Sequence, residues 1–371
     1  MQFFVFNMIN WPYLEGPTSF PISTSIYDPR KGHELYEKYL DLAELTEILG
    51  FDALCIPEHH GQPISAIPCP NIMASAVIQR TKKLKIAITG TCLLLRGHPL
   101  RVAEEIAMLD NMSGGRIISG FLRGSPREAL SYNQNPKEPM ERLEEAWDFV
   151  VKCWTSREPF KWEGKYYNYK NVAVWPRPYQ EPHPPLIYLG TSADSAEFAA
   201  RKRVGIGGSF MPTHEMKKCF DRYREICKKT GWSAGADQLM FLRQVHVSDT
   251  NEKARKEAES AIDYYWQFLM AQRKDIYSEL KKMEKELGGF KPDDPGIFNW
   301  TEWWKFNYDI CQKGGLSIIG DPDYVIDQIR EQQEQLGAGT LICFFQWGSM
   351  PAEAAKKSMT LFAEKVMPAF K

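Results

Sequence analysis

The chain has 371 residues, of which 43% are hydrophobic and 25% are charged, the ordinary balance of a globular protein. Its 46 basic and 47 acidic residues give a formal net charge of −1, so no global electric field selects nucleic acid or an anionic membrane as a partner. No apolar run is long enough to span a membrane, and polar residues interrupt the apolar N-terminus too early for a signal peptide, so we expect a cytoplasmic protein.

Eight cysteines are scattered along the chain without any Cys-x-x-Cys pair. Most lie within apolar or helical stretches, which favours reduced, packed thiols over a disulfide framework or a zinc site.

Short apolar runs alternate with longer helical patterns from end to end. The predicted strands are Phe3–Phe6, Asp52–Ile56, Leu84–Thr89, Arg116–Phe121, Leu186–Leu189, Gly205–Phe210, Leu239–Val247 and Thr340–Phe345. The predicted helices are 33–49, 71–80, Leu100–Met112, 139–154, 193–203, 213–230 and 351–367. Eight parallel strands alternating with helices predict a closed (β/α)8 TIM barrel, formed by residues 1–371 as a single domain. A doubly wound open sheet is the alternative, but no Gly-x-Gly-x-x-Gly follows the first strand.

Two segments interrupt the alternation. Residues 157–185 are rich in proline and aromatic residues and form an excursion after the fourth major helix. Residues 263–312 follow the seventh strand and should therefore lie over the C-terminal face of the barrel, where active sites are built. We expect this insertion to be an active-site lid, with a satellite packing unit as the alternative. Its aromatic cluster comprises Trp300, Trp303, Trp304, Phe306 and Tyr308.

The triplet Glu58-His59-His60 follows the second strand directly. Three titratable side chains at a strand end are costly to bury, which points to a functional role, although a surface turn would also accommodate them. Adjacent residues of an extended segment point to opposite sides, so the two histidines are poorly placed to hold one metal ion. We therefore expect no metal here, and one histidine acting as an acid or base.

Glycines and hydroxyl side chains mark three further strand ends. Gly90-Thr91 follows the third strand, where a glycine lets the backbone approach a flat ligand. Arg123-Gly124 follows the fourth strand, where a guanidinium suits a phosphate or forms an ordinary ion pair. Thr191, Ser192 and Ser195 bridge the fifth strand to a helix, as an anion site or as an ordinary N-cap. Neighbouring strand ends can converge, so the phosphate interpretation gains when these sites are taken together.

The order of these motifs resembles the bacterial luciferase-like flavin monooxygenases. The resemblance runs from the first strand to near residue 230 and resumes near 315. It is carried by Leu49-Gly50-Phe51-Asp52, Glu58-His59-His60, Gly90-Thr91, His98-Pro99-Leu100-Arg101, Met108-Leu109-Asp110-Asn111, Ser113-Gly114-Gly115-Arg116, Arg123-Gly124, Glu163-Gly164-Lys165-Tyr166-Tyr167, Pro176-Arg177-Pro178, Ser192 and Ser358-Met359.

The resemblance implies a barrel that binds reduced FMN (FMNH2). It assigns the phosphate to Arg123, Ser192 and Ser195, and it places Thr191 near the flavin ring. It also implies a non-proline cis peptide at Gly90-Thr91 under the ring, and an acid/base role for His59 with Glu58 and His60 beside it. One departure stands out: luciferase has a reactive cysteine before the Arg-Gly pair, where this chain has Leu122. Light emission is therefore not implied.

The reaction implied by the resemblance is monooxygenation. Reduced flavin, supplied by a separate flavin reductase, forms a peroxyflavin with O2 and oxygenates a small, apolar organic substrate. We expect Phe344, Gln346 and Trp347, at the end of the eighth strand, to shape the substrate pocket, and we expect a homodimer. The alternatives are an F420-dependent hydride-transfer oxidoreductase on the same barrel, a non-catalytic flavin-binding partner subunit and a metal-dependent hydrolase.

Overall fold

Eight parallel strands close into a barrel in the computed structural model, which describes residues 1–16, 18–135, 140–270, 273–288 and 306–370. The strands are β1 (Gln2–Phe6), β2 (Ala53–Ile56), β3 (Lys85–Cys92), β4 (Ile117–Leu122), β7 (Leu186–Leu189), β8 (Gly205–Gly208), β9 (Leu239–Val247) and β11 (Thr340–Phe344). They pair in the order β1-β2-β3-β4-β7-β8-β9-β11, and β11 pairs with β1 to close the ring. The predicted TIM barrel and its eight strands are confirmed.

The strands are almost entirely apolar because both of their faces are buried, one inside the barrel and one under the helices. β1 and β11 illustrate the pattern, since they pair in parallel from Gln2 opposite Thr340 to Phe6 opposite Phe344. Every residue of β11 is buried, and so is every residue of β9. Runs in which apolar residues predominate made the strands recognisable in the sequence, although β9 also buries Arg243, Gln244 and His246.

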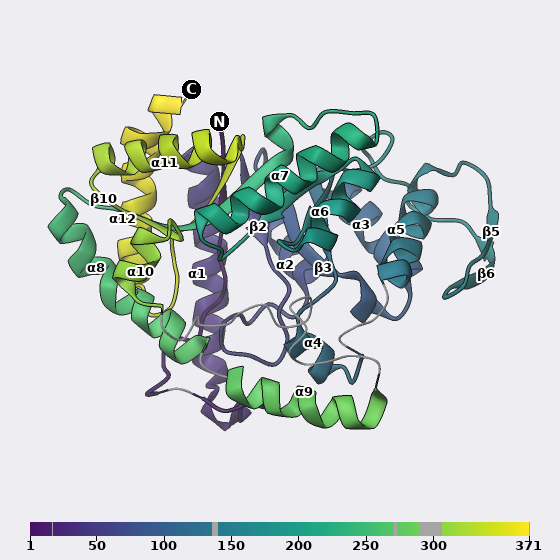
Figure 1. The fold of residues 1–371 in the computed structure, drawn as a ribbon, viewed down its shortest axis with the longest axis horizontal. Helices are drawn as coiled ribbons and strands as arrows, with labels where there is room; N and C mark the ends of the chain where they lie inside the picture. The colour runs from purple at the N-terminus through teal and green to yellow at the C-terminus, as the bar shows by residue number, and fades with distance from the viewer. Residues whose placement is uncertain (17, 136–139, 271–272, 289–305, 371) are drawn as a thin grey trace.

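Helices surround the barrel as predicted, with ends that differ by a few residues from those expected (Figure 1). They are α1 (Pro29–Ile48), α2 (Pro70–Arg80), α3 (Pro99–Ser113), α5 (Met140–Thr155), α6 (Ala193–Lys202), α7 (Thr213–Lys229) and α12 (Ala352–Leu361). Local signals set the ends: Asp28 caps α1 by accepting a hydrogen bond from the backbone of Arg30, and α3 ends where Gly114 adopts a φ of 67°.

Several elements were not predicted. They are α4 (Pro126–Ser131), β5 (Phe160–Glu163), β6 (Asn168–Val172), α8 (Asn251–Tyr264), a π-helical turn (Tyr265–Leu269), α9 (Arg273–Leu287), α10 (Tyr308–Lys313), β10 (Ser317–Gly320) and α11 (Pro322–Leu336). The excursion 157–185 contains the antiparallel hairpin β5-β6, which projects from the side of the barrel (Figure 1). β10 pairs with the last residues of β9, from Gln244 to Val247, and so extends the sheet beyond the barrel.

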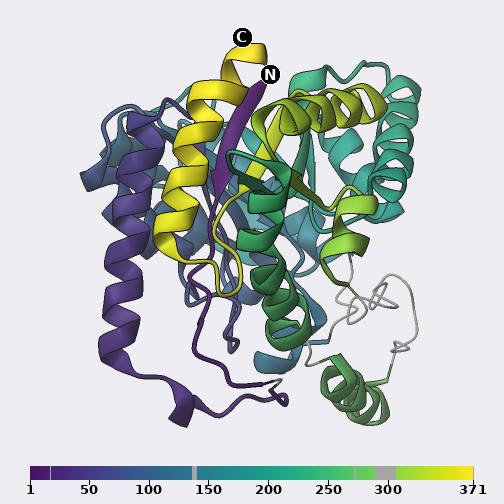
Figure 2. The same ribbon diagram turned by 90° about the vertical axis from the view of Figure 1, so that its left-hand side faces the viewer.

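The two chain termini lie together at one end of the barrel, whereas α4 and α9 lie at the other (Figures 1 and 2). Since β1 runs from the terminal end, the carboxyl ends of the parallel strands face α4 and α9. Part of the 263–312 insertion therefore lies at the C-terminal face, as expected. Trp300, Trp303 and Trp304 of its aromatic cluster lie outside the described residues.

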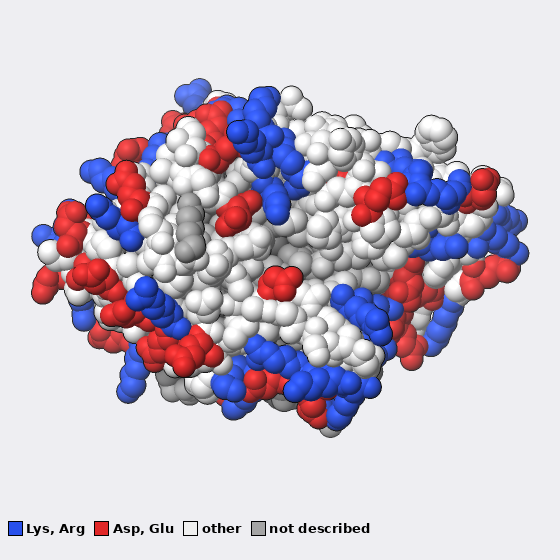
Figure 3. Space-filling model, turned by 90° about the horizontal axis from the view of Figure 1, so that it is seen from above, with Lys and Arg blue, Asp and Glu red and all other residues white. Residues whose placement is uncertain are grey.

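Charged side chains of both signs are interspersed on the face at the terminal end (Figure 3), as the near-zero net charge suggests. All eight cysteines are free, and seven of them are buried. Over the described ranges, no helix combines the length and apolar character that a membrane crossing requires.

Candidate active site

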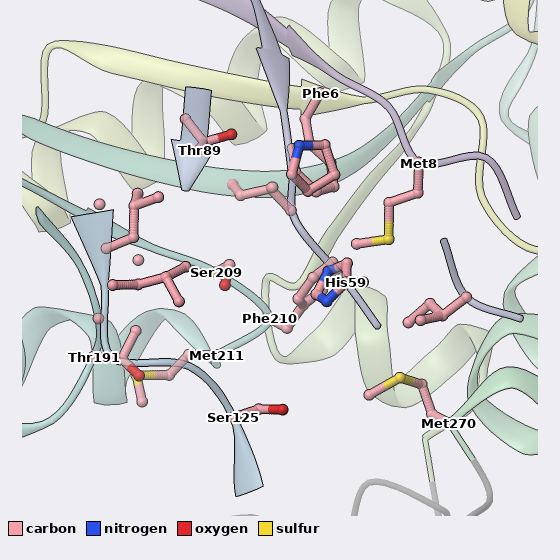
Figure 4. Close-up of a pocket in the computed structure, with 18 of the residues that line it drawn as sticks. Phe6, Met8, His59, Thr89, Ser125, Thr191, Ser209, Phe210, Met211 and Met270 are labelled. Atoms are coloured by element: carbon pink, nitrogen blue, oxygen red, sulfur yellow. The ribbon is translucent and has the colours of Figure 1, made fainter. Parts of the chain in front are cut away.

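A cavity of about 670 Å³ opens at the carboxyl ends of the barrel strands. This volume lies in the range of pockets that hold cofactors and small substrates. Side chains from strand ends and from the insertion meet around it, and Figure 4 shows His59 in the centre of the view with Thr191 and Met211 to one side and Met270 to the other. Its polar lining comprises Glu58, His59, Gln62, Thr89, Ser125, Arg127, Glu128, Thr191, Ser209 and Glu215.

His59 is held against a buried carboxylate. Its Nδ1 lies 3.2 Å from Oε1 of Glu128, whose side chain is 2% exposed, while the imidazole itself is 28% exposed. Glu128 lies in α4, where it also accepts hydrogen bonds from Gln62 and from the backbone and hydroxyl of Ser125. Burial alone would raise the pKa of Glu128, but the hydrogen bond and charge of His59, the charge of Arg127 and the Ser125 amide lower it overall. The carboxylate is therefore ionised, and it orients the imidazole by accepting a hydrogen bond from the Nδ1–H group.

Glu58 and His60 form a second, separate network. Oε1 of Glu58 lies 2.9 Å from Nε2 of His60, and Oε2 lies 2.5 Å from Nη2 of Arg96. The other ring nitrogen of His60 lies 3.1 Å from the hydroxyl of Tyr132. Both residues are buried, and only Glu58 lines the cavity. The two histidines thus contact different carboxylates, in agreement with the opposite directions expected of adjacent residues.

Hydroxyl groups gather at the start of α6. Ser192 caps the helix by accepting a hydrogen bond from the Ser195 amide at 3.1 Å, and the two hydroxyl oxygens lie 2.9 Å apart. Arg123 lies close enough for its charge to act on Tyr188, a buried residue of β7. Burial raises the pKa of Tyr188 to about 12, against the opposing effects of Arg123 and a hydrogen bond from Ser195. Arg123 and Ser195, which were predicted to bind a phosphate, therefore both lie near Tyr188. Thr191 lines the cavity.

Glycines give this side of the cavity a surface without side chains. A Cβ on Gly190 would lie 2.3 Å from the Ser195 hydroxyl oxygen, and one on Gly207 would lie 2.7 Å from a methyl group of Leu189. Gly190, Gly207 and Gly208 all line the cavity. Backbone and small hydroxyls can therefore meet a flat ligand directly here, as the prediction of a flavin site requires.

The prediction for Gly90-Thr91 needs a correction. The non-proline cis peptide is Thr89–Gly90, one bond earlier in the chain, at the point where the β3–β4 register shifts. Thr89 lines the cavity, whereas Thr91 is fully buried. A Cβ on Gly90 would lie 2.8 Å from Leu189, so Gly90 is packed behind the cavity wall. Gly124 has a φ of 100°, which explains a glycine after Arg123.

The three residues expected to shape the substrate pocket lie behind its surface. Phe344 is fully buried, with ring centroids 5.1 Å from Phe6 and 5.9 Å from Tyr265, and Trp347 is also fully buried. The amide of Gln346 lies against Asn7. From this strand Ile342 reaches the cavity, and the rest of the apolar wall comes from the residues Phe6, Met8, Ile64, Leu122, Leu189, Phe210, Met211, Leu242, Tyr265, Met270, Ile276 and Phe306.

Sequence reasoning missed Gln62, Arg127 and Glu128. A signal for the last of these was present, because Ser125-Pro126-Arg127-Glu128 has the spacing of a capping box, and α4 begins with one. Nothing in the sequence alone linked Glu128 to His59, which is 69 residues away. Among the described residues, no group of three or more His, Cys, Asp or Glu side chains could hold a metal ion.

Known proteins resemble the chain along almost its full length. The sequence model of the family described as luciferase-like monooxygenase matches residues 20–340. The oxygenase component of a flavin-dependent trigonelline monooxygenase from Acinetobacter baylyi is 24% identical over 355 residues, covering 93% of this chain and 92% of that protein.

Two solved structures share the fold. The FMN complex of the oxygenating constituent of 3,6-diketocamphane monooxygenase from Pseudomonas putida superposes with a TM-score of 0.76 at 19% identity, covering 99% of this chain and 98% of the other. A coenzyme F420-dependent tetrahydromethanopterin reductase from Methanopyrus kandleri gives 0.70 at 20% identity, covering 100% and 99%.

Proposed function

The chain belongs to the luciferase-like monooxygenase family, and from this premise we propose that it is the oxygenase of a two-component, FMNH2-dependent monooxygenase. A separate flavin reductase supplies the reduced FMN. A small organic substrate receives one oxygen atom from O2, and the other leaves as water with the two electrons and two protons of FMNH2. The observation that carries the proposal is the pair of His59 and ionised Glu128, which faces the same cavity as the glycine and hydroxyl surface around Gly190.

The residues around Gly190 and Ser195 fit FMN. A phosphate needs a positive charge and hydrogen-bond donors, which Arg123, Ser192 and Ser195 provide at the start of α6. A flat ring needs a surface without side chains, which Gly190 and Gly207 provide. Bound reduced flavin supplies the electrons and the capacity to activate O2.

His59 handles the proton in this proposal. Because Nδ1–H donates a hydrogen bond to Glu128, Nε2 is the nitrogen left to take up or release a proton in the cavity. Glu128 acts through His59: it fixes the tautomer and stabilises the charged imidazole. Glu58 and His60 form a supporting network beside this pair.

The apolar part of the cavity excludes water. Met270, Ile276 and Phe306, from the described part of the 263–312 insertion, line the cavity together with Phe210. We propose that these residues act as the lid, because the electrons of the reduced flavin are lost to O2 as hydrogen peroxide when water and stray protons reach the reacting atoms.

A homodimer is part of the same proposal. The outer surfaces of α2 and α3 expose large apolar side chains, with Ile72 72% exposed, Met108 55% and Met112 41%. Pairing of these surfaces between two copies would remove them from water.

The test is to mix purified protein with photoreduced FMN and then with oxygen. We expect the wild-type protein to bind reduced FMN and to slow the return of the oxidised flavin spectrum. We expect His59→Ala to speed that return and to release more hydrogen peroxide. The matched control is His33→Ala at an exposed position of α1, which should behave as wild type. Failure to bind reduced FMN, together with hydride transfer from reduced F420 and no oxygen consumption, would replace the proposal by the F420-dependent alternative.

A further inference from the structure

Arg127 is a buried cation at the cavity wall. It is 7% exposed and follows Pro126 in α4, next to Glu128. Among the described residues that line the cavity, it is the single lysine or arginine. Burial lowers the pKa of Arg127 to about 10, so the guanidinium keeps its charge at neutral pH.

The partners of Arg127 do not neutralise it directly. Nη1 donates to the side-chain oxygen of Gln62, which is a neutral amide. Nε has no hydrogen-bond partner in the described part of the chain, and no ion pair to Arg127 is formed there. The neighbouring Glu128 carboxylate attracts the guanidinium at longer range, but its oxygens are taken by His59, Gln62 and Ser125. A buried charge left in this state is costly unless a ligand supplies the missing anion.

A second polar group lies near the guanidinium. Tyr265, in the π-helical turn after α8, is fully buried and lines the cavity, and its hydroxyl has no hydrogen-bond partner among the described residues. Burial raises the pKa of Tyr265 and the charge of Arg127 opposes this, so the two groups act on each other. The phenol is therefore neutral and can donate to an oxygen atom that also contacts the guanidinium.

The surroundings of these two groups are apolar and aromatic. The ring of Phe210 lies 5.8 Å from that of Tyr265, and Phe306 and Met270 line the cavity with them. A site with one positive charge, one phenol donor and aromatic walls matches a compact group with one negative charge on an apolar body. A planar carboxylate suits the guanidinium fork, whereas a phosphate dianion would bring more charge than this single cation can balance.

We propose that Arg127 and Tyr265, supported by Gln62, bind the carboxylate of an aromatic or alicyclic acid substrate. The inference rests on the proposed function for the identity of the reaction, but the binding site itself requires no turnover. It narrows the substrate from an apolar compound to an apolar acid held beside His59.

Benzoate and benzamide are the probes, because they have the same ring and differ in charge. Binding is measured by titration calorimetry with the protein saturated with oxidised FMN, so that the probes cannot occupy the flavin's part of the cavity. We expect the wild-type protein to bind benzoate and to bind benzamide at least tenfold more weakly. Arg127→Gln should weaken benzoate binding at least tenfold and should remove the preference over benzamide, since a charge-assisted hydrogen bond is lost. Tyr265→Phe should weaken benzoate binding severalfold.

A control variant and the following outcomes decide between the proposal and its alternatives. Arg157→Gln makes the same change on the exposed β5-β6 side of the molecule and should leave benzoate binding as in wild type. If Arg127→Gln weakens FMN binding and leaves benzoate binding unchanged, Arg127 serves the flavin and the proposal is wrong. It is also wrong if benzamide binds as tightly as benzoate to the wild-type protein. If Arg127→Gln does not fold, Arg127→Lys and Tyr265→Phe decide, with weaker benzoate binding supporting the carboxylate site and unchanged binding overturning it. If benzoate binds as expected but the protein does not react with reduced FMN and O2, the carboxylate site is supported and the proposed monooxygenase function is refuted.

Discussion

Replacing Glu128 by glutamine tests the link between the buried carboxylate and His59. The substitution preserves shape but removes the charge and turns one acceptor into a donor. In the wild-type protein one oxygen of Glu128 accepts from His59 and Gln62, and the other accepts from Ser125. Whichever way a glutamine amide turns, its NH2 group faces groups that also donate. Each buried donor left unsatisfied costs about 1–3 kcal/mol, so we expect the free energy of unfolding to fall by about 2–5 kcal/mol.

Glu128→Gln should also slow proton transfer by His59 in the molecules that remain folded. A charge-assisted hydrogen bond that stabilises the imidazolium is worth about 1.5–3 kcal/mol, which corresponds to a ~10- to 150-fold slower proton transfer by His59. The assay is the yield of hydrogen peroxide per reduced flavin consumed, measured well below the unfolding temperature of the variant. The control is Glu141→Gln on α5, where the carboxylate is 69% exposed.

The stability difference between wild type and Glu128→Gln should also depend on pH. The pKa of Glu128 is depressed in the folded protein, so its stabilisation is complete above the ordinary carboxyl pKa and is lost as the pH falls through the folded-state value. The gap between the two unfolding curves should therefore be constant near neutral pH and should narrow in acid. A gap that is absent at pH 7, together with unchanged peroxide yield, would refute the role of Glu128 as the residue that positions His59.

Two further predictions concern the flavin site and the dimer. Gly190→Ala places a Cβ 2.3 Å from the Ser195 hydroxyl oxygen and should weaken FMN binding at least tenfold, as measured by flavin fluorescence. The control Gly16→Ala, with open space around its Cβ, should leave FMN binding unchanged. If Gly190→Ala binds FMN as tightly as the wild-type protein, Ser195 is not part of the binding site. Ile72→Glu puts a charge on the exposed surface of α2 and should convert a dimer to a monomer, as measured by light scattering. A dimer unaffected by the change, or a wild-type monomer, would rule out this interface.

The barrel could be predicted from the sequence because its buried strands consist mostly of apolar residues, and this pattern is visible in the sequence. The predicted run Leu239–Val247 has the same bounds as β9, because apolar residues predominate in it although it also contains Arg243, Gln244 and His246. β10 was missed because four residues, Ser317–Gly320, give too short a signal, and its partner is the far end of a strand that is already paired. For α11 the signals were present, with Asp321 as the cap and Gly337 at the end with a φ of 59°.

The location of the candidate site could be predicted better than the hydrogen-bond partners of its residues. Strand ends located His59 and Thr191 at one cavity, but hydrogen bonds between distant segments, such as that of His59 with Glu128, depend on how α4 packs. Phe344 was predicted on the correct face of its strand, since it shares the inward face with Ile342. It does not reach the cavity surface as predicted, because it is fully buried. Tyr265, from the π-helical turn, covers it, and a π-helical turn has no clear sequence pattern.

The two sides of the cavity differ in how freely they can change during evolution. Gly190 and Gly207 admit no larger residue without displacing Ser195 or Leu189, so almost every mutation there alters the surface proposed to bind the flavin. The opposite wall is made of whole side chains, among them Met270 and Phe306, which belong to an insertion outside the barrel's strands. Such side chains can be exchanged for others of different size without disturbing the strands. In the proposed monooxygenase, a fixed cofactor surface would thus be separate from an adjustable substrate surface, which would let one barrel acquire new substrates by changes confined to a single segment.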